Sequence, residues 1–192
     1  MWGLVESGSI TKLINNPKGM VIGDTRHSRK IFELWTNEER EAIGIYEVIF
    51  DDSNKKDEAY YMNTNQSFDY ADGEVTASYG SATPKELDDV TDENDNVTKG
   101  LKSQKKDIIK EQASGLLAPT DWYVLKAIDV EDYSVPSAVS TFRTNVRTRS
   151  NEMETAIDNA SDVDALKALY EYTEQADGSF ARPLGEFPTL EI

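Results

Sequence analysis

The apolar residues of this chain follow two different periods, and this change of period constrains the fold more than any other feature of the sequence. In the first half, short apolar runs that alternate with polar residues are separated by turn residues, as at 3–6, 59–62 and 67–71. In the second half, apolar residues recur at every third or fourth position. Alternation is typical of strands and the longer spacing of helices. The sequence therefore predicts an α+β chain: a small N-terminal antiparallel β domain, a C-terminal helical bundle of about four helices, and an extended C-terminal arm.

Two local signals locate elements in the first half. Asp72 and Gly73 lie between two alternating runs, which predicts a hairpin because Gly accepts the positive φ of a two-residue turn. Thr36 and Glu39 have the spacing of a capping box, and Gly44 supplies a left-handed stop. We therefore expect a short helix between Thr36 and Gly44, followed directly by a strand.

An acidic stretch near residue 90, ELDDVTDENDNVTKG, carries almost no apolar side chains. Such a composition is typical of a linker. We therefore predict a β-rich domain at 1–90, an acidic linker at 91–100, a helical domain at 101–176 and an extended arm at 177–192.

The stretch LLAPTDWYVLKA, residues 116–127, predicts a corner between two helices. Gly115 is expected to end the first helix, since a Gly followed by an apolar residue is typical of a helix C-terminus. Leu116 and Leu117 are expected to enter the core. Pro119 disfavours helical geometry at Ala118, the residue before it.

The next helix is expected to start at Thr120 or Asp121, either of which can cap it. Trp122 then follows as a structural anchor, together with Leu116, Leu117 and Asp121. A buried Trp contributes a large apolar area and requires a partner for its indole N–H. The segment is thus predicted to be a packed corner.

The longest predicted helix runs from about residue 135 to 160, with Pro136 in its first turn, where the missing N–H is no loss. A final helix is expected after Ser161. The apolar stripe of the long helix can form a bundle face or a seam with another subunit. Its members are Val139, Phe142, Val146, Met153, Ala156, Ile157 and Ala160.

Composition excludes several classes of site. The chain has no Cys and one His, so thiol nucleophiles, disulfides and Cys-based metal sites are excluded. The formal net charge of -16 argues against a nucleic-acid groove, which requires clustered Lys and Arg. No apolar run is long enough to span a membrane, and the N-terminus lacks the pattern of a signal peptide. Partners are therefore expected to be neither nucleic acid nor membrane.

Two short motifs invite a catalytic or metal-binding interpretation and fail it. Asp24, His27 and Ser28 share one polar loop, whereas catalytic triads are assembled from distant segments. The stretch 92–96, DENDN, resembles a calcium loop but has Val97 where such a loop needs Gly. A weak surface cation site there is the alternative to a solvated linker. We expect no enzyme activity and no cofactor.

Two surfaces are candidates for protein contacts. Lys102 and Lys106 belong to the only basic cluster, which is either a solvated helix face or a docking site for an acidic partner. The C-terminal tail carries regularly placed apolar residues on a Gly- and Pro-containing stretch that cannot be helical. It either packs on its own domain or crosses to a neighbour as an extended arm, and we favour the second. The predicted contact residues of the tail are Phe180, Leu184, Phe187, Leu190 and Ile192.

A resemblance rests on three consecutive stretches: LLAPTDWYVLKA, SVPSAVSTFRTNVRT and SNEMETAIDNASDVDALKALYEY. Together they resemble the C-terminal module of a diffuse group of tailed-bacteriophage proteins, described as tail-fibre assembly or virion-associated structural proteins. The first half, from WGLVESGSITK through DYADGEVTASYGSATPKELDDV, is similar to the β-module that precedes such regions. The acidic insert TDENDNVTK departs from the pattern. The matching residues are Leu116, Leu117, Thr120, Asp121, Trp122, Pro136, Phe142, Arg143, Val146 and Arg147.

The resemblance implies a phage protein. The apolar tail, the apolar stripe of the long helix and the lack of catalytic residues favour a structural, non-enzymatic virion protein of the tail or tail fibre that acts through protein–protein interfaces. An assembly chaperone for tail fibres is the alternative, and a carboxylate-based glycosidase is ranked third. The implied partners are other phage structural proteins, with a further copy of this chain as an additional candidate. The implied location is the virion, assembled in the host cytoplasm.

Overall fold

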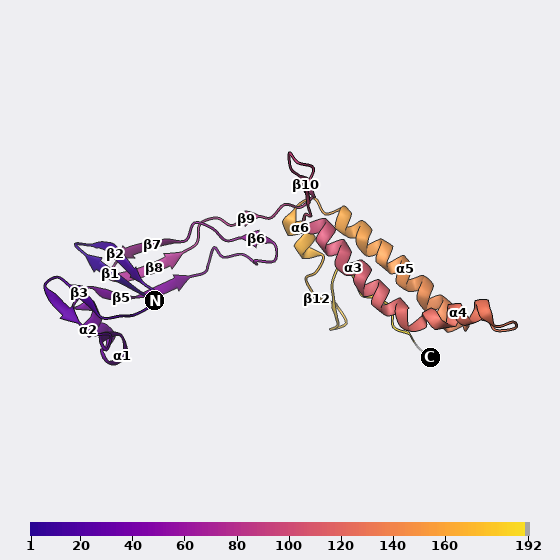
Figure 1. Ribbon diagram of the computed structural model, residues 1–192, viewed down its shortest axis with the longest axis horizontal. Helices are drawn as coiled ribbons and strands as arrows, with labels where there is room; N and C mark the ends of the chain where they lie inside the picture. Colours follow the sequence, from indigo (N-terminus) through magenta and orange to yellow (C-terminus); the bar gives the residue numbers. More distant parts are fainter. Residues whose placement is uncertain (191–192) are drawn as a thin grey trace. The chain divides into compact units, whose positions relative to one another are not determined.

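The structure is a computed structural model that describes residues 1–190 (Figure 1). The chain divides into two compact units, Met1–Thr83 and Pro84–Ile192. The first contains most of the strands and the second contains the long helices, so the predicted α+β class is confirmed. The division lies a few residues before the predicted boundary at 90.

The first unit is built on one five-stranded sheet with the order β2-β1-β5-β8-β7. The sheet is mixed, because β5 and β8 run parallel while every other neighbouring pair is antiparallel. The prediction of an antiparallel domain is therefore wrong at this pair. After β5, the chain first forms β7 at the edge of the sheet. It then turns back through a hairpin into β8, which lies between β5 and β7 and runs parallel to β5. The strands are β1 (Trp2–Glu6), β2 (Ser9–Ile14), β5 (Ile45–Asp51), β7 (Ser67–Ala71) and β8 (Glu74–Ser78).

Short elements surround this sheet. Two helices precede β5, and two small ladders pair β3 with β4 and β6 with β9. The elements are β3 (Met20–Ile22), β4 (Thr25–His27), α1 (Ile31–Leu34), α2 (Asn37–Glu41), β6 (Tyr61–Met62) and β9 (Thr83–Pro84).

The local signals of the first half are confirmed. Asp72 and Gly73 have φ values of 53° and 85° and join β7 to β8 in the predicted hairpin. Thr36 and Glu39 form both hydrogen bonds of the capping box at the start of α2. Gly44 has a φ of 81°, and a Cβ there would lie 2.5 Å from the Val5 carbonyl oxygen. Gly44 is therefore needed for its conformation and for the close approach of β1.

Apolar side chains pack in two clusters in this unit. One joins α1 to β1, β2 and β5 through Leu4, Ile14, Ile31, Phe32 and Ile45. The other joins β1, β5 and β8. Both faces of the sheet are therefore partly covered, with β5 contributing to each.

The second unit begins with a small hairpin of β10 (Val90–Thr91) and β11 (Val97–Thr98). The segment predicted to be a linker is thus an ordered hairpin. The Asp92 carboxylate accepts hydrogen bonds from the Asn94 and Asn96 amides and closes its turn. The side-chain amide of Asn96 is the main reason that the pKa of Asp92 lies below its usual value. The acidic stretch is therefore ordered because the side chain of Asp92 closes its turn, which the composition of the stretch did not indicate.

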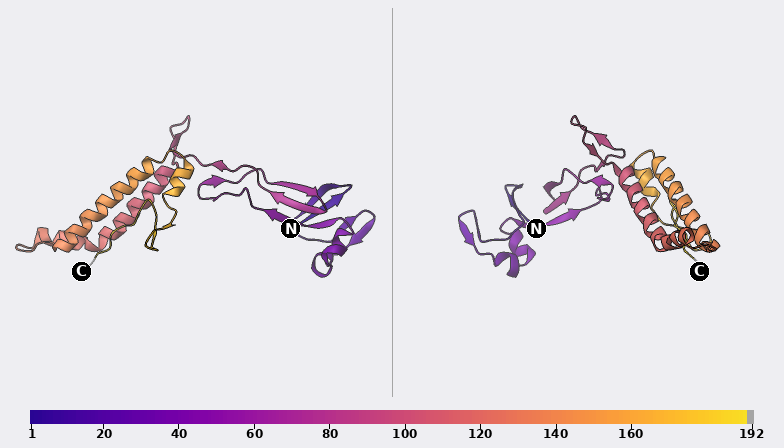
Figure 2. Two further views of the ribbon diagram at one scale, coloured as in Figure 1. Left: turned by 180° about the vertical axis from the view of Figure 1, so that it is seen from behind. Right: turned by 45° about the vertical axis from the view of Figure 1, so that its right-hand side comes forward.

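Two long helices, α3 (Leu101–Leu117) and α5 (Ser137–Asp158), pack side by side in both views of Figure 2. Six members of the predicted apolar stripe of α5 are buried, and Ser150 takes the place next to Arg149 where the stripe breaks. The stripe faces α3, so it is a bundle face. The shorter helix α6 (Val163–Ala168) follows, and the side chain of Asp162 caps it.

The predicted helix end at Gly115 is wrong. Helix α3 continues through Gly115 to Leu117, a 3-10 turn at Ala118–Thr120 follows, and α4 (Asp121–Asp129) continues without an extended residue. Ala118 is helical although it precedes Pro119. A Gly inside a helix costs only about 1 kcal/mol, which packing of α3 on α5 offsets.

The predicted arm does not extend away from its own unit. After α6, the strands β12 (Thr173–Glu174) and β13 (Phe180–Ala181) form a hairpin, and the chain then returns to the helices. Leu184 is 2% exposed, and its N–H donates to the Leu169 carbonyl oxygen at 2.9 Å. Phe187 and Leu190 pack against the cluster of α3 and α5. The tail therefore packs on its own unit, in contrast to the predicted arm that crosses to a neighbour.

Candidate functional site

Helix α4 follows α3 at one end of the helical unit (Figure 1). It presents an apolar surface to solvent. Trp122, Leu125 and Ile128 are 50%, 61% and 76% exposed, and Val124 and Val130 are exposed beside them. None of the residues of α4 is buried. We name the surface formed by Trp122, Val124, Leu125, Ile128 and Val130 the α4 face.

The α4 face is unusual because its helix turns the apolar side outward. Positions 122, 125 and 128 follow the three-residue spacing that places side chains along one side of a helix. The only half-buried side chains of α4 are Tyr123 and Ala127, which lie on the other side. In an amphipathic helix of a folded domain, the apolar stripe normally faces the core. Here no element of its own unit, within the described residues 84–190, covers the stripe.

A set of side-chain contacts fixes the start of α4. The 3-10 turn shifts the backbone ladder, so the Leu117 carbonyl oxygen accepts its hydrogen bonds from side chains: Thr120 Oγ1 at 2.7 Å and Arg143 Nη1 at 3.0 Å. Arg143 Nη1 also lies 2.8 Å from the Asp121 carboxylate. Arg143 of α5 therefore holds the end of α3 and the beginning of α4 together. Thr120, Asp121 and Arg143 therefore form one set of contacts at the junction of the two helices.

A lysine lies over the aromatic rings of the same region. Lys126 Nζ is 4.3 Å from the centre of the Tyr133 ring and 5.8 Å from that of Trp122. Trp122 also contacts the Tyr123 ring, with 3.8 Å between ring centres. Ring contacts and a cation thus orient Trp122 without burying it.

Acidic side chains border the C-terminal end of the α4 face. Asp129, Glu131 and Asp132 are exposed, and among residues 1–190 none of them has an ion-pair partner. Asp132 has a φ of 66°, which turns the chain back toward α5. The α4 face therefore combines an apolar centre with an unneutralised negative border.

The four predicted anchors behave differently. Leu116 and Leu117 pack on the cluster of Ala113, Phe142 and Val146, as expected, and Asp121 pairs with Arg143. Trp122 is half exposed, so its role as a buried anchor is wrong. The sequence shows the three-residue spacing of Trp122, Leu125 and Ile128. It does not indicate which side of the helix α5 covers.

The basic cluster is neutralised within its own unit. Lys102 Nζ lies 3.2 Å from the Asp88 carboxylate, and Lys106 Nζ lies 2.7 Å from that of Asp158. The hydrogen bond to Asp158 raises the pKa of Lys106. The lysines therefore serve to hold α3 against its neighbours.

The predicted contact residues of the tail are separated in the structure. Leu184, Phe187 and Leu190 lie against their own helices, whereas Phe180 is exposed on β13. Ile192 lies outside the described residues. Arg149 fixes the returning segment by donating to the Leu184 and Glu186 carbonyl oxygens at 2.8 and 3.2 Å.

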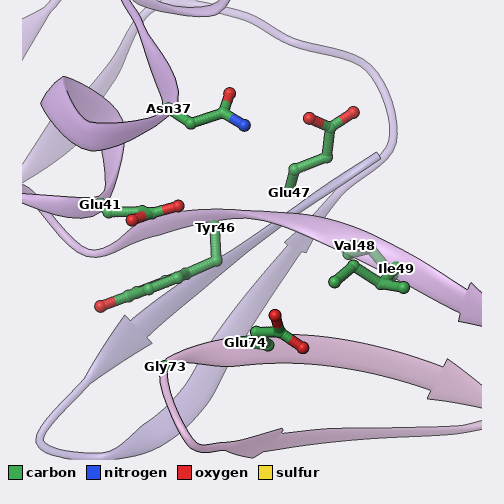
Figure 3. Close-up of a pocket in the computed structure, with 8 residues that line it drawn as sticks. All are labelled: Asn37, Glu41, Tyr46, Glu47, Val48, Ile49, Gly73 and Glu74. Carbon is green, nitrogen blue, oxygen red and sulfur yellow. The ribbon is translucent and has the colours of Figure 1, made fainter.

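The first unit contains an open pocket of about 360 Å³ beside β5 (Figure 3). Glu41, Glu47 and Glu74 contribute carboxylates to its wall, and the rings of Tyr46 and Tyr70 meet nearby through their hydroxyl groups. The hydrogen bond from Tyr70 raises the pKa of Tyr46. Within residues 1–190, no group of acidic, His or Cys side chains has the arrangement of a metal site. The wall of the pocket thus combines three carboxylates with the ring of Tyr46.

The short motifs considered from the sequence have structural roles. The His27 ring packs edge-on against Trp35 at 5.7 Å between ring centres, and Ser28 Oγ accepts a hydrogen bond from the Lys30 N–H. The Asp92 carboxylate is engaged by the amides of its own turn. No helix in the described part of the chain has the length and apolar character needed to cross a bilayer.

Comparison with known proteins gives no assignment: the sequence matches no protein-family model, and it has no match among the curated proteins or the solved structures. The α4 face is therefore the feature on which a function can be argued.

Proposed function

We propose that this chain is a non-enzymatic structural protein of a bacteriophage virion, located in the tail or tail fibre, that acts through protein–protein interfaces. The observation that carries the proposal is the α4 face, an outward apolar stripe on a helix whose first turn is held to α5 by Arg143. The sequence resemblance of the Thr120–Trp122 stretch to tailed-phage proteins supports the assignment to a phage particle.

The energetics favour a covered α4 face. Full burial of a large apolar side chain contributes about 1.5–3 kcal/mol relative to leaving it in water. At least half of the surface of each of Trp122, Leu125 and Ile128 is exposed to solvent. Three such side chains that meet a partner together provide a binding centre of the kind found in the middle of protein interfaces, where Trp is enriched.

The proposed partners are other phage structural proteins, in the tail or fibre. A tail-fibre assembly chaperone is the alternative function, and the same resemblance supports it. Both functions use a protein interface. They differ in whether the chain remains in the finished particle.

Mass spectrometry of purified particles from the phage that encodes the chain separates the two. A structural protein is recovered from particles in stoichiometric amount after stringent washing. Recovery from infected-cell lysate but not from particles would reject the structural role and leave the chaperone. The variant Leu125→Gln/Ile128→Gln should be lost from particles, while Leu34→Gln, an equally exposed position in the first unit at 70%, should be retained.

A further inference from the structure

We infer that the α4 face binds a basic amphipathic segment of another protein, one with apolar side chains at helical spacing flanked by Lys or Arg. This inference rests on the proposed function only in requiring that the chain acts through a protein interface. It adds the chemistry of the partner, which the apolar stripe and its charged border together define.

The length of the apolar stripe sets the size of the contact. Trp122 and Ile128 are six residues apart, so the stripe is about 9 Å long, or nearly two helical turns. It is a ridge of single side chains at three-residue spacing, with Leu125 between the two ends. Such a ridge matches the groove between two rows of side chains on a partner helix.

The acidic border of the α4 face favours a partner with positive charge. Asp129, Glu131 and Asp132 stand within four positions at one end of the stripe, without ion-pair partners in the described chain. Asp121, at the other end, is neutralised by Arg143, and Lys126 lies over the Trp122 and Tyr133 rings. The unmatched charge of the border is therefore negative. A partner with Lys or Arg beside its apolar stripe meets that charge and gains rate and specificity of binding.

The same charges argue against two other occupants. Two copies of this chain would bring one acidic border toward another, and each copy carries a formal net charge of -16. A membrane with anionic lipids would repel the border, whereas peripheral membrane helices carry Lys and Arg on their polar face. A basic protein segment is the occupant that both the stripe and its border favour.

The test uses the purified full chain and a synthetic helical peptide of Leu and Lys, with Leu at three- and four-residue spacing. A peptide with every Lys replaced by Glu is its control. Isothermal titration calorimetry should show one bound Leu/Lys peptide per chain and no binding of the Leu/Glu peptide. Leu125→Gln/Ile128→Gln should weaken binding by about tenfold or more, which corresponds to about 1.4 kcal/mol. Leu34→Gln should leave binding unchanged.

A second pair of variants tests the border. Asp129→Asn/Glu131→Gln/Asp132→Asn should weaken binding of the Leu/Lys peptide by several-fold at low salt, and the difference should shrink at high salt. A matched triple change in the first unit, Asp24→Asn/Asp52→Asn/Asp69→Asn, removes the same charge and should have little effect. Circular dichroism confirms that each variant retains its helices, as exposed positions should.

Three results overturn the inference. Equal losses in the two triple variants would show that the peptide responds only to net charge. Self-association of the chain that Leu125→Gln/Ile128→Gln abolishes would assign the α4 face to a second copy. Binding of zwitterionic phosphatidylcholine vesicles with the same sensitivity would assign it to a membrane. Because these measurements use the purified chain, absence from phage particles would reject the proposed function and leave the peptide result standing.

Discussion

Replacement of Gly185 by Ala should weaken the attachment of the C-terminal segment to the second unit. Gly185 has a φ of 71°, and a Cβ there would clash with the guanidinium group of Arg149. The Arg149 side chain must then move away and lose its hydrogen bonds to the Leu184 and Glu186 carbonyl oxygens. Left-handed geometry costs a non-Gly residue about 1–2 kcal/mol, and a hydrogen bond to a charged group contributes about 1.5–3 kcal/mol. Because the Arg149 side chain is 30% exposed, water replaces part of what is lost, and we count the two bonds as one. We therefore expect Gly185→Ala to lower the free energy of unfolding by about 2.5–5 kcal/mol.

Gly178 provides a matched control for this change. Its φ is 81°, but a Cβ there would have no other atom within 4 Å. Gly178→Ala should therefore cost only the backbone penalty of about 1–2 kcal/mol. The assay is urea denaturation followed by far-ultraviolet circular dichroism, which reports mainly the long helices of this unit. Equal destabilisation by the two substitutions would refute the role assigned to Arg149.

Three further changes test the remaining contacts. Thr36→Ala should lower the stability of the first unit by about 1 kcal/mol in chemical denaturation, since it removes the capping box, and an unchanged midpoint would contradict that role. Arg143→Lys should cost about 1.5–3 kcal/mol in urea denaturation of the second unit, because Lys cannot bridge Leu117 and Asp121, and wild-type stability would reject the bridge. The raised pKa of Lys106 means that its bond to Asp158 stabilises the fold fully below the ordinary pKa of 10.5 and is lost as the pH rises through the folded-state pKa. As the pH rises from neutral, the stability gap between wild type and Lys106→Met in thermal melts should therefore close only at strongly alkaline pH, and a gap already closed at neutral pH would contradict this ion pair.

Features that depend on neighbouring residues could be predicted from the sequence. The capping box at Thr36, the stop at Gly44 and the turn at Asp72 and Gly73 are each determined within a few residues. The buried stripe of α5 was also readable, because its period reports which side of the helix is apolar. Which element covers that stripe was left open and required the structure.

Features that depend on distant residues could not be predicted in the same way. Helix α3 continues past Gly115 because it packs on α5. A stop signal read from neighbouring residues does not report this contact. Trp122 is exposed because Arg143, 21 positions later, fixes the start of α4 and leaves the Trp side outward. The tail folds back because Arg149 binds backbone carbonyls 35 and 37 positions away. The apolar character of these segments was evident, but the side on which it is buried was not.

The most direct test of the α4 face is photo-crosslinking in assembled particles. A benzoylphenylalanine at Ile128, in the α4 face, is compared with one at Leu34, which is similarly exposed in the first unit. The account predicts that the probe at Ile128 crosslinks to a different virion protein, through a segment that carries Lys or Arg beside apolar residues, and that the probe at Leu34 gives no such product. Particles that contain the chain but show no partner crosslink at Ile128, or the same crosslinks at both positions, would contradict it.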